Sequence, residues 1–121
     1  MVHTDLWTGN VLWRQGEITG VIDWEMAAYG DPAIDVAYCR MDMCLVGMDE
    51  AADHFLKAYE SATDRRLENL KLWELVSAAG SMPDPASWLP YWRALGDTWS
   101  TRHHANEHRR FVANALHRTA M

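Results

Sequence analysis

The fold of this chain is decided by two stretches near the amino terminus, His3-Thr4-Asp5-Leu6-Trp7-Thr8-Gly9-Asn10 and Val21-Ile22-Asp23-Trp24. They contain two carboxylates, Asp5 and Asp23, and one amide, Asn10. A carboxylate can accept a proton and bind a hard cation, whereas an amide oxygen binds magnesium without adding charge. The two stretches therefore predict a site that handles a proton and a magnesium ion.

The segment between these stretches predicts a β-hairpin. Val11–Arg14 and Ile18–Ile22 are two candidate strands, joined by a turn that contains a Gly. The hairpin starts after Asn10 and ends on Asp23, so both predicted ligands should meet at one end of a rigid element. Taken alone, the pattern also fits a plain surface hairpin with polar ends. The position of Asp5, five residues before Asn10, favours a functional site.

The same spacing occurs in phosphoryl-transfer sites, where an Asp accepts the proton of the attacking hydroxyl, an Asn five positions later holds magnesium, and an Asp after a strand holds the bridging magnesium. The chain resembles the aminoglycoside phosphotransferase and choline kinase-like enzymes, whose segments are His-Gly-Asp-Leu-His-Pro-Gly-Asn-Val-Leu and Val-Ile-Asp-Trp-Glu, then Gly-Asp-Pro and an Asp. The matching residues are His3, Asp5, Leu6, Gly9–Leu12, Val21–Glu25, Gly30–Pro32 and Asp35–Ala37.

This resemblance implies a phosphotransferase that moves the γ-phosphate of ATP or GTP to a hydroxyl of a small molecule such as an aminoglycoside. It implies that Asp5 is the catalytic base and that Asn10 and Asp23 bind Mg²⁺ and, through it, the nucleotide. His3 and Asp35 are expected to support the loop. For Asp35, which should lie in the first turn of a helix, an equally good interpretation is that it complements the helix dipole.

Three residues depart from the family pattern. Trp7 stands where His is common, Thr8 replaces Pro, and Thr4 replaces Gly. A role for Trp7 beside the phosphate or acceptor and a role in packing are both open.

The resemblance also implies an amino-terminal lobe that covers the nucleotide and supplies a phosphate-binding Lys, and the chain has no segment for it. We therefore expect residues 1–121 to form a single domain that corresponds to the carboxy-terminal lobe. An alternative is a truncated, inert remnant, or a module for nucleotide binding or association. Self-association, most simply as a homodimer, is expected through apolar surface around Leu6, Trp7 and Val11.

The remainder of the chain predicts helices, because apolar residues recur at spacings of three and four. The predicted fold class is therefore α+β and mainly helical, with one hairpin and about five helices. A break is expected over Gly80–Pro85. The expected helices are Ala33–Leu45, Met48–Ala62, Leu67–Ala79, Ala86–Leu95 and Asn106–Arg118.

Composition excludes several functions. The net charge of -6 argues against nucleic acid as a partner, which needs clustered positive charge. No apolar run is long enough to span a bilayer, so no membrane partner and a cytoplasmic location are expected. The basic, His-rich run from Arg102 to Arg110 is interpreted as a solvated helix face rather than a metal site.

Two further residue types have structural interpretations. Cys39 and Cys44 lie five apart in a predicted helix and point to different sides, so they should be buried thiols and not a disulfide. Trp24 is expected to anchor Asp23 by packing. Most of the other Trp side chains are expected in the core; they are Trp13, Trp73, Trp88, Trp92 and Trp99.

Overall fold

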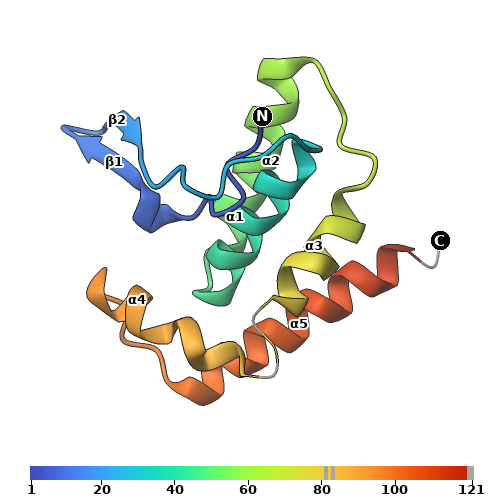
Figure 1. Cartoon of the computed structure of the whole chain (residues 1–121). Coiled ribbons are helices and arrows are strands. Elements are labelled where there is room, and N and C mark those ends of the chain that lie inside the picture. The colour runs from blue at the N-terminus through green and yellow to red at the C-terminus, as the bar shows by residue number, and fades with distance from the viewer. Residues whose placement is uncertain (81, 83, 120–121) are drawn as a thin grey trace.

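The computed structural model of the chain describes residues 1–80, 82 and 84–119, and the side chains of 118 and 119 are not described. It is a mainly helical α+β fold with one two-stranded antiparallel sheet, as predicted (Figure 1). Of the predicted break at Gly80–Pro85, Ser81 and Pro83 lie outside the described residues. The elements are η1 (Thr8–Asn10), β1 (Val11–Arg14), β2 (Glu17–Val21), α1 (Ala33–Leu45), α2 (Asp49–Thr63), α3 (Leu70–Ala79), η2 (Pro85–Trp88), α4 (Leu89–Ala94) and α5 (Thr101–Thr119).

The hairpin projects from the helical body (Figure 1). Val11 pairs with Val21 and Arg14 with Glu17, and the register shifts at a bulge between Leu12 and Trp13. The second strand begins and ends one residue earlier than predicted, because the turn takes only two residues with positive φ, as a tight hairpin turn requires.

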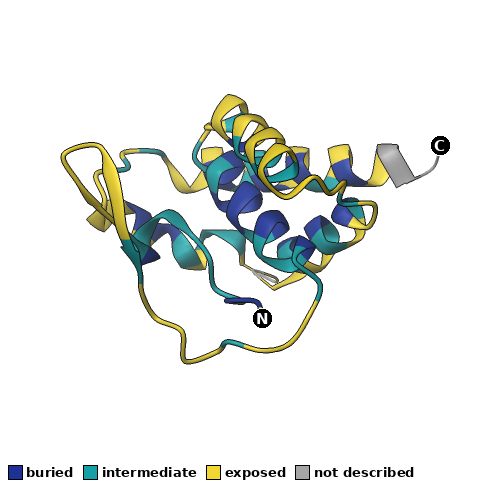
Figure 2. Cartoon of the chain, turned by 90° about the horizontal axis from the view of Figure 1, so that it is seen from above, coloured by how far each residue is buried: buried dark blue, intermediate teal, exposed yellow. Residues whose placement is uncertain are grey.

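Helix α1 forms the centre of the core, between α2 on one side and α3 and α5 on the other (Figures 1 and 2). Met41 and Leu45 on α1 are fully buried, and they pack with Ala52 of α2, Ala78 of α3 and Phe111 of α5. Burial of this shared apolar face holds the helices together. The amino-terminal loop lies against the start of the same helix.

A charged network lies inside this core. The guanidinium of Arg40 on α1 donates to the carboxylate of Glu74 on α3 at 2.9 Å and to that of Asp53 on α2 at 3.1 Å. Lys71 donates to the other oxygen of Glu74 at 2.6 Å. The side chain of Glu74 is only 1% exposed, so this pair is a buried one that joins α1 to α3.

Besides shifts of one residue in α2 and at the end of α5, helix bounds differ from the predictions at three places. Helix α3 begins at Leu70, three residues late, because the backbone N–H of Leu67 is bound by the side chain of Glu60. The predicted helix over residues 86–95 is divided into η2 and α4. Helix α5 begins at Thr101, five residues early, because the hydroxyl of Ser100 accepts the N–H of His103 and so caps the first turn.

The interpretation of the His-rich run as a solvated face is wrong for two of its residues. His104 and His108 lie four apart on one side of α5, and both are buried, while His103 is exposed. The ring of His108 forms a hydrogen bond of 2.9 Å with the backbone carbonyl of Ala78. This side of α5 therefore belongs to the interface with α3.

The Trp side chains also differ in how far they are buried. Trp92 is buried, and Trp73, Trp88 and Trp99 are partly buried. Trp13 is 59% exposed, contrary to the prediction, because it lies on the hairpin, which projects from the helical body. Cys39 and Cys44 are buried free thiols, as predicted, and burial raises the pKa of each to about 12.

Among residues 1–80, 82 and 84–119, no helix combines the length and the apolar character that crossing a bilayer requires.

Thr4 has a φ of 71°, which is unfavourable for a β-branched residue, and its hydroxyl donates to the carbonyl of Met26 at 2.8 Å. We expect Thr4→Ala to lower the free energy of unfolding by about 1 kcal/mol, because the hydrogen bond is lost and the strain remains. Thr4→Gly should be more stable than Thr4→Ala by about 1 kcal/mol, since Gly adopts positive φ without a Cβ clash. Urea unfolding of the three proteins measures this order, and an Ala variant as stable as the Gly variant would contradict it.

Candidate active site

Asp35 holds the amino-terminal loop on the start of α1. Its two carboxylate oxygens accept the backbone N–H groups of His3 at 2.7 Å and Thr4 at 2.8 Å. These are the hydrogen bonds that the resemblance implies for this residue. Because Asp35 also lies in the first turn of α1, the same carboxylate faces the positive end of the helix dipole.

His3 joins the loop to the end of β2. Its ring is 1% exposed; Nδ1 accepts the backbone N–H of Asp5 at 3.2 Å, and Nε2 lies 2.7 Å from the carbonyl of Ile22. Since the Asp5 N–H can only donate, the ring proton is assigned to Nε2, which donates to Ile22. The indole of Trp24 lies against this ring with centroids 4.6 Å apart. Trp24 therefore packs on His3.

Asn10 is buried at the base of the hairpin. Its side-chain Nδ2 donates to the backbone carbonyl of Asp5 at 2.9 Å and to the Asp5 carboxylate at 3.3 Å. The backbone carbonyl of Asn10 accepts the N–H of Ile22 at 2.9 Å. Both partners of Nδ2 can only accept, which fixes the orientation of the amide. Oδ1 is thus turned away from Asp5, and it is the atom that a metal ion would use.

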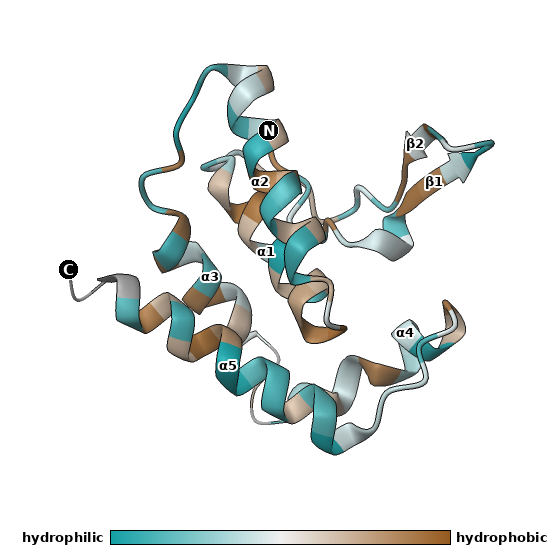
Figure 3. Ribbon diagram, turned by 180° about the vertical axis from the view of Figure 1, so that it is seen from behind, coloured by the Kyte–Doolittle hydropathy of each residue, from teal (hydrophilic) through white to brown (hydrophobic). Residues whose placement is uncertain are grey.

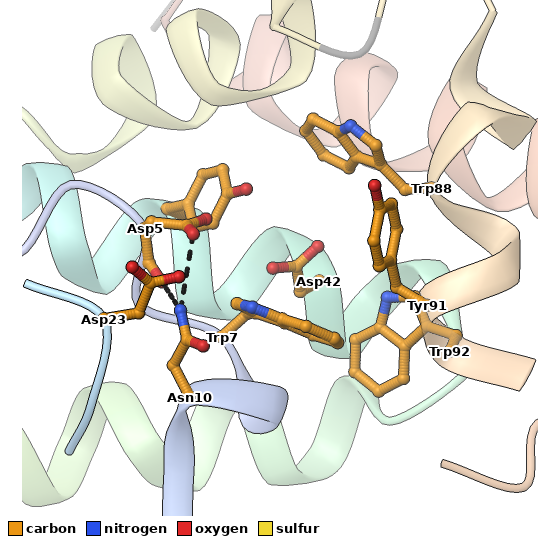
Figure 4. A pocket seen from close by; sticks show the side chains of 9 residues that line it. Asp5, Trp7, Asn10, Asp23, Asp42, Trp88, Tyr91 and Trp92 are labelled. Carbon is orange, nitrogen blue, oxygen red and sulfur yellow. Dashed lines mark hydrogen bonds between the residues drawn. The ribbon is translucent and has the colours of Figure 1, made fainter. Parts of the chain in front are cut away.

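Asp23 follows β2 with a φ of 63°, a conformation that Asp tolerates better than most residues. It lines the same cavity as Asp5 and Asn10, and Figure 4 shows the three side chains gathered at one end of it. The sequence prediction that the hairpin brings these residues together therefore agrees with the geometry. Within the described part of the chain no group of three His, Cys, Asp or Glu side chains could hold a metal ion. Magnesium here would be held by one carboxylate and one amide, with water and phosphate oxygens as further ligands, which suits this ion.

The cavity has a volume of about 360 Å³, and half of its wall was not predicted. Tyr38 and Asp42 reach it from α1, and three aromatic side chains reach it from η2 and α4 (Figure 4). A signal was present in the sequence, since Asp35, Tyr38 and Asp42 have helical spacing and share one face. The aromatic residues from η2 and α4 are Trp88, Tyr91 and Trp92.

Asp42 is the unusual member of this wall, because it is a carboxyl group with only 3% of its surface exposed. Burial, and to a lesser extent the charge of Asp5, raises the pKa of Asp42 well above its ordinary value. Burial followed by the charges of Asp42 and Asp5 raises the pKa of Tyr38 as well, so that Tyr38 remains a neutral phenol.

Trp7 both packs and lines the cavity. Its indole lies so close to Gly9 that a Cβ added there would be 2.2 Å from the ring. The ring also meets Trp92 edge to face, with centroids 5.5 Å apart, and Tyr91 at 6.4 Å. The position that carries His in the resembling enzymes is thus occupied by a closely packed indole ring that lines the cavity.

A proton-accepting carboxylate beside an amide and a second carboxylate at the base of a hairpin is the arrangement that phosphoryl transfer uses. The sequence profile of the phosphotransferase enzyme family matches residues 1–73, which is more than half of the chain, and the chain belongs to this family. The matched part contains the loop, the hairpin, α1 and α2, and so includes Asp5, Asn10, Asp23 and Asp35. No solved structure matches the chain.

Proposed function

We propose that this chain forms the magnesium-binding half of a small-molecule kinase, which transfers the γ-phosphate of ATP or GTP to a hydroxyl group. The observation that carries the proposal is that Asp5, Asn10 and Asp23 line one cavity. The resemblance suggests an aminoglycoside as a first acceptor to test.

The three residues have different tasks. Asp5 accepts the proton of the acceptor hydroxyl, and its carboxylate is oriented by the amide of Asn10. Asn10 and Asp23 hold Mg²⁺, which neutralises charge on the nucleotide phosphates when it is bound. Asp35 and His3 hold the loop by hydrogen bonds, so that Asp5, Asn10 and Asp23 keep their positions without reorganisation.

Further positive charge must come from elsewhere. Among the described residues that line the cavity there is no Lys or Arg. In this proposal the chain acts as a carboxy-terminal lobe, and a nucleotide-covering lobe supplies the cation and excludes water. Without that lobe, transfer by the isolated chain should be weak.

Nucleotide titration in the presence and absence of Mg²⁺ tests the metal site. We expect Asp23→Asn to weaken Mg²⁺-dependent binding of ATP by about tenfold or more, because it removes the charged ligand. Glu25→Gln is the matched control, since Glu25 is an exposed carboxylate two residues away. Equal ATP affinity in the wild type and Asp23→Asn would contradict the proposed site, and parallel titration with GTP determines the nucleotide.

A second candidate function is association with another chain, and the exposed apolar surface favours it. The sequence places this surface around Leu6, Trp7 and Val11, and each of these residues is partly buried. Apart from Met1, the large exposed apolar side chains in the amino-terminal region lie on the hairpin and the segment after it. They are Leu12, Trp13, Ile18, Ile22, Trp24, Met26 and Tyr29.

We expect the chain to form a dimer that buries this hairpin surface, since exposed apolar patches promote association. The mass measured by light scattering should rise with concentration, and the double variant Trp13→Ser with Ile18→Ser should remain monomeric. Leu72→Ser, at an α3 residue that is 56% exposed, is the matched control and should behave as the wild type. A wild type that stays monomeric at all concentrations would exclude this candidate.

A further inference from the structure

We propose that a second cavity, on the side of α1 away from the candidate active site, binds a small oxyanion of the phosphate type. The cavity has a volume of about 360 Å³ and is lined by residues of α1, α2, α3 and α5. Arg40 lines it, whereas Tyr38, two positions earlier on α1, lines the candidate active site. Positions two apart point to nearly opposite faces of a helix. The two cavities are therefore separate, and the oxyanion site does not depend on the proposed function.

Arg40 is a buried cation whose hydrogen-bonding capacity is only partly used. Its side chain is 8% exposed. Nε donates to Glu74 at 2.9 Å, and Nη1 donates to the backbone carbonyl of Ala52 at 2.6 Å and to Asp53 at 3.1 Å. Among the residues that the structure describes, none accepts a hydrogen bond from Nη2, which carries two N–H groups. A buried donor without a partner is unfavourable, and a ligand oxygen in the cavity would pair it.

Lys71 and Arg110 bring further donors to the cavity. The Lys71 ammonium has three N–H groups, and one oxygen of Glu74 lies 2.6 Å from it. Arg110 donates to carboxylates through Nε and Nη2, and in the described part of the chain Nη1 has no partner. Both oxygens of Glu74, in contrast, are already bound, one by Arg40 and the other by Lys71. The wall therefore keeps free donors, and a ligand rich in acceptors fits it.

The buried end of the cavity has an excess of positive charge. The side chains of Arg40 and Lys71 are 8% and 22% exposed, and that of Glu74, which lies between them, is 1% exposed. The other two carboxylates of the wall, Asp49 and Asp53, are 43% and 63% exposed, so water screens their charge. An anion at the buried end would therefore meet two cations and one carboxylate at close range, and the net attraction favours its binding.

The donors suit an oxyanion in particular. A guanidinium offers paired N–H groups that match the oxygens of a phosphate, and an ammonium adds a compact charge. Asn114 and His117 line the cavity from α5, which is largely hydrophilic (Figure 3), and both can donate to further oxygens. The volume of about 360 Å³ is near the lower end of the range of roughly 300–1,000 Å³ for ligand pockets, so a small ligand fits best. Inorganic phosphate is therefore the probe of choice.

Titration of the full chain with sodium phosphate, in EDTA and without nucleotide, tests the oxyanion site. EDTA removes Mg²⁺, and the candidate active site then offers carboxyl groups and, among the described residues that line it, no Lys or Arg to attract phosphate. Calorimetry should give one site per chain with a Kd of about 1 mM or tighter. The midpoint of thermal unfolding should rise by about 3 °C or more at phosphate tenfold above the Kd, because the ligand binds the folded state.

Sodium chloride at the same ionic strength is the reference for this titration. Phosphate also stabilises proteins because it is excluded from their surface, but that effect does not saturate at millimolar concentrations. A midpoint equal to that in sodium chloride, or a rise without saturation, would overturn the proposal.

Three variants locate the bound anion. Lys71→Gln should weaken phosphate binding by about tenfold and Arg110→Gln by roughly threefold or more, since each removes a positive charge from the wall. Arg109→Gln is the matched control, because Arg109 is an exposed neighbour that donates to Asn106 and lines a different cavity, and its phosphate affinity should equal that of the wild type.

The side chain of Arg110 is 46% exposed, so Arg110→Gln should fold even if Lys71→Gln does not. Unchanged phosphate affinity in a folded variant at position 71 or 110, or an equal loss in Arg109→Gln, would overturn the proposal.

Discussion

Asp5→Asn is expected to lower the rate of phosphate transfer by about 10²–10⁴-fold, which is the range that a positioned proton acceptor contributes. The substitution keeps the shape of the side chain, and its amide oxygen can still accept the hydrogen bond from Nδ2 of Asn10. It removes the group that takes the proton and little of what holds the phosphates. Transfer should be measured under single-turnover conditions, with the chain complemented by a nucleotide-covering lobe where the isolated chain is too slow.

Binding of ATP with Mg²⁺ provides the control for this variant. We expect the affinity to change by no more than about twofold in Asp5→Asn, whereas Asp23→Asn should lose both binding and transfer. The roles of Asp5 and Asp23 are thereby distinguished, because the two substitutions differ in their effect on ATP binding. A variant at position 5 with wild-type turnover would show that Asp5 is not the base, and one that binds ATP poorly would show that it is a metal ligand instead.

Glu74→Gln should lower the free energy of unfolding by about 3–5 kcal/mol, because it removes one partner of a buried ion pair. The guanidinium of Arg40, with its side chain 8% exposed, would keep only the solvent-exposed carboxylate of Asp53 as an ionic partner. Lys71 would lose its contact as well. Urea unfolding followed by circular dichroism measures the change.

The surface pair of Arg110 with Asp49 is the matched control, since its side chains are 46% and 43% exposed. Arg110→Gln should change the free energy of unfolding by less than about 1 kcal/mol, because exposed pairs contribute little. The double variant Arg40→Met with Glu74→Leu should recover much of the loss, as apolar replacement of a buried pair often does. A loss below about 1 kcal/mol in Glu74→Gln would mean that water reaches the network.

The part of the candidate site that contains Asp5, Asn10 and Asp23 was predictable from sequence because it is local. Asn10 and Asp23 flank one hairpin, whose tight turn determines that its ends meet, and Asp5 lies only five positions before Asn10. The contact of Asp35 with the loop spans only about thirty residues, and the family pattern implies it.

The aromatic part of the cavity wall was not predictable, because it depends on how distant helices pack. Trp88 and Trp92 come more than eighty residues after Trp7, and their spacing fits core packing equally well. The sequence also does not reveal that Trp13 is exposed, since an apolar strand residue has the same pattern whether or not another element covers it. The early start of α5 depended on one Ser cap, and caps are weak signals in a polar segment.

Helix α1 has a consequence for how this protein can change during evolution. Asp35 holds the loop, Arg40 is paired in the core and Asp42 lines the cavity, so substitutions at these three positions affect both the fold and the cavity. Tyr91 on α4 lines the cavity while 62% of its surface faces solvent. Substitutions at Tyr91 can therefore reshape the cavity with little loss of stability, whereas substitutions on α1 must preserve both the core and the cavity wall.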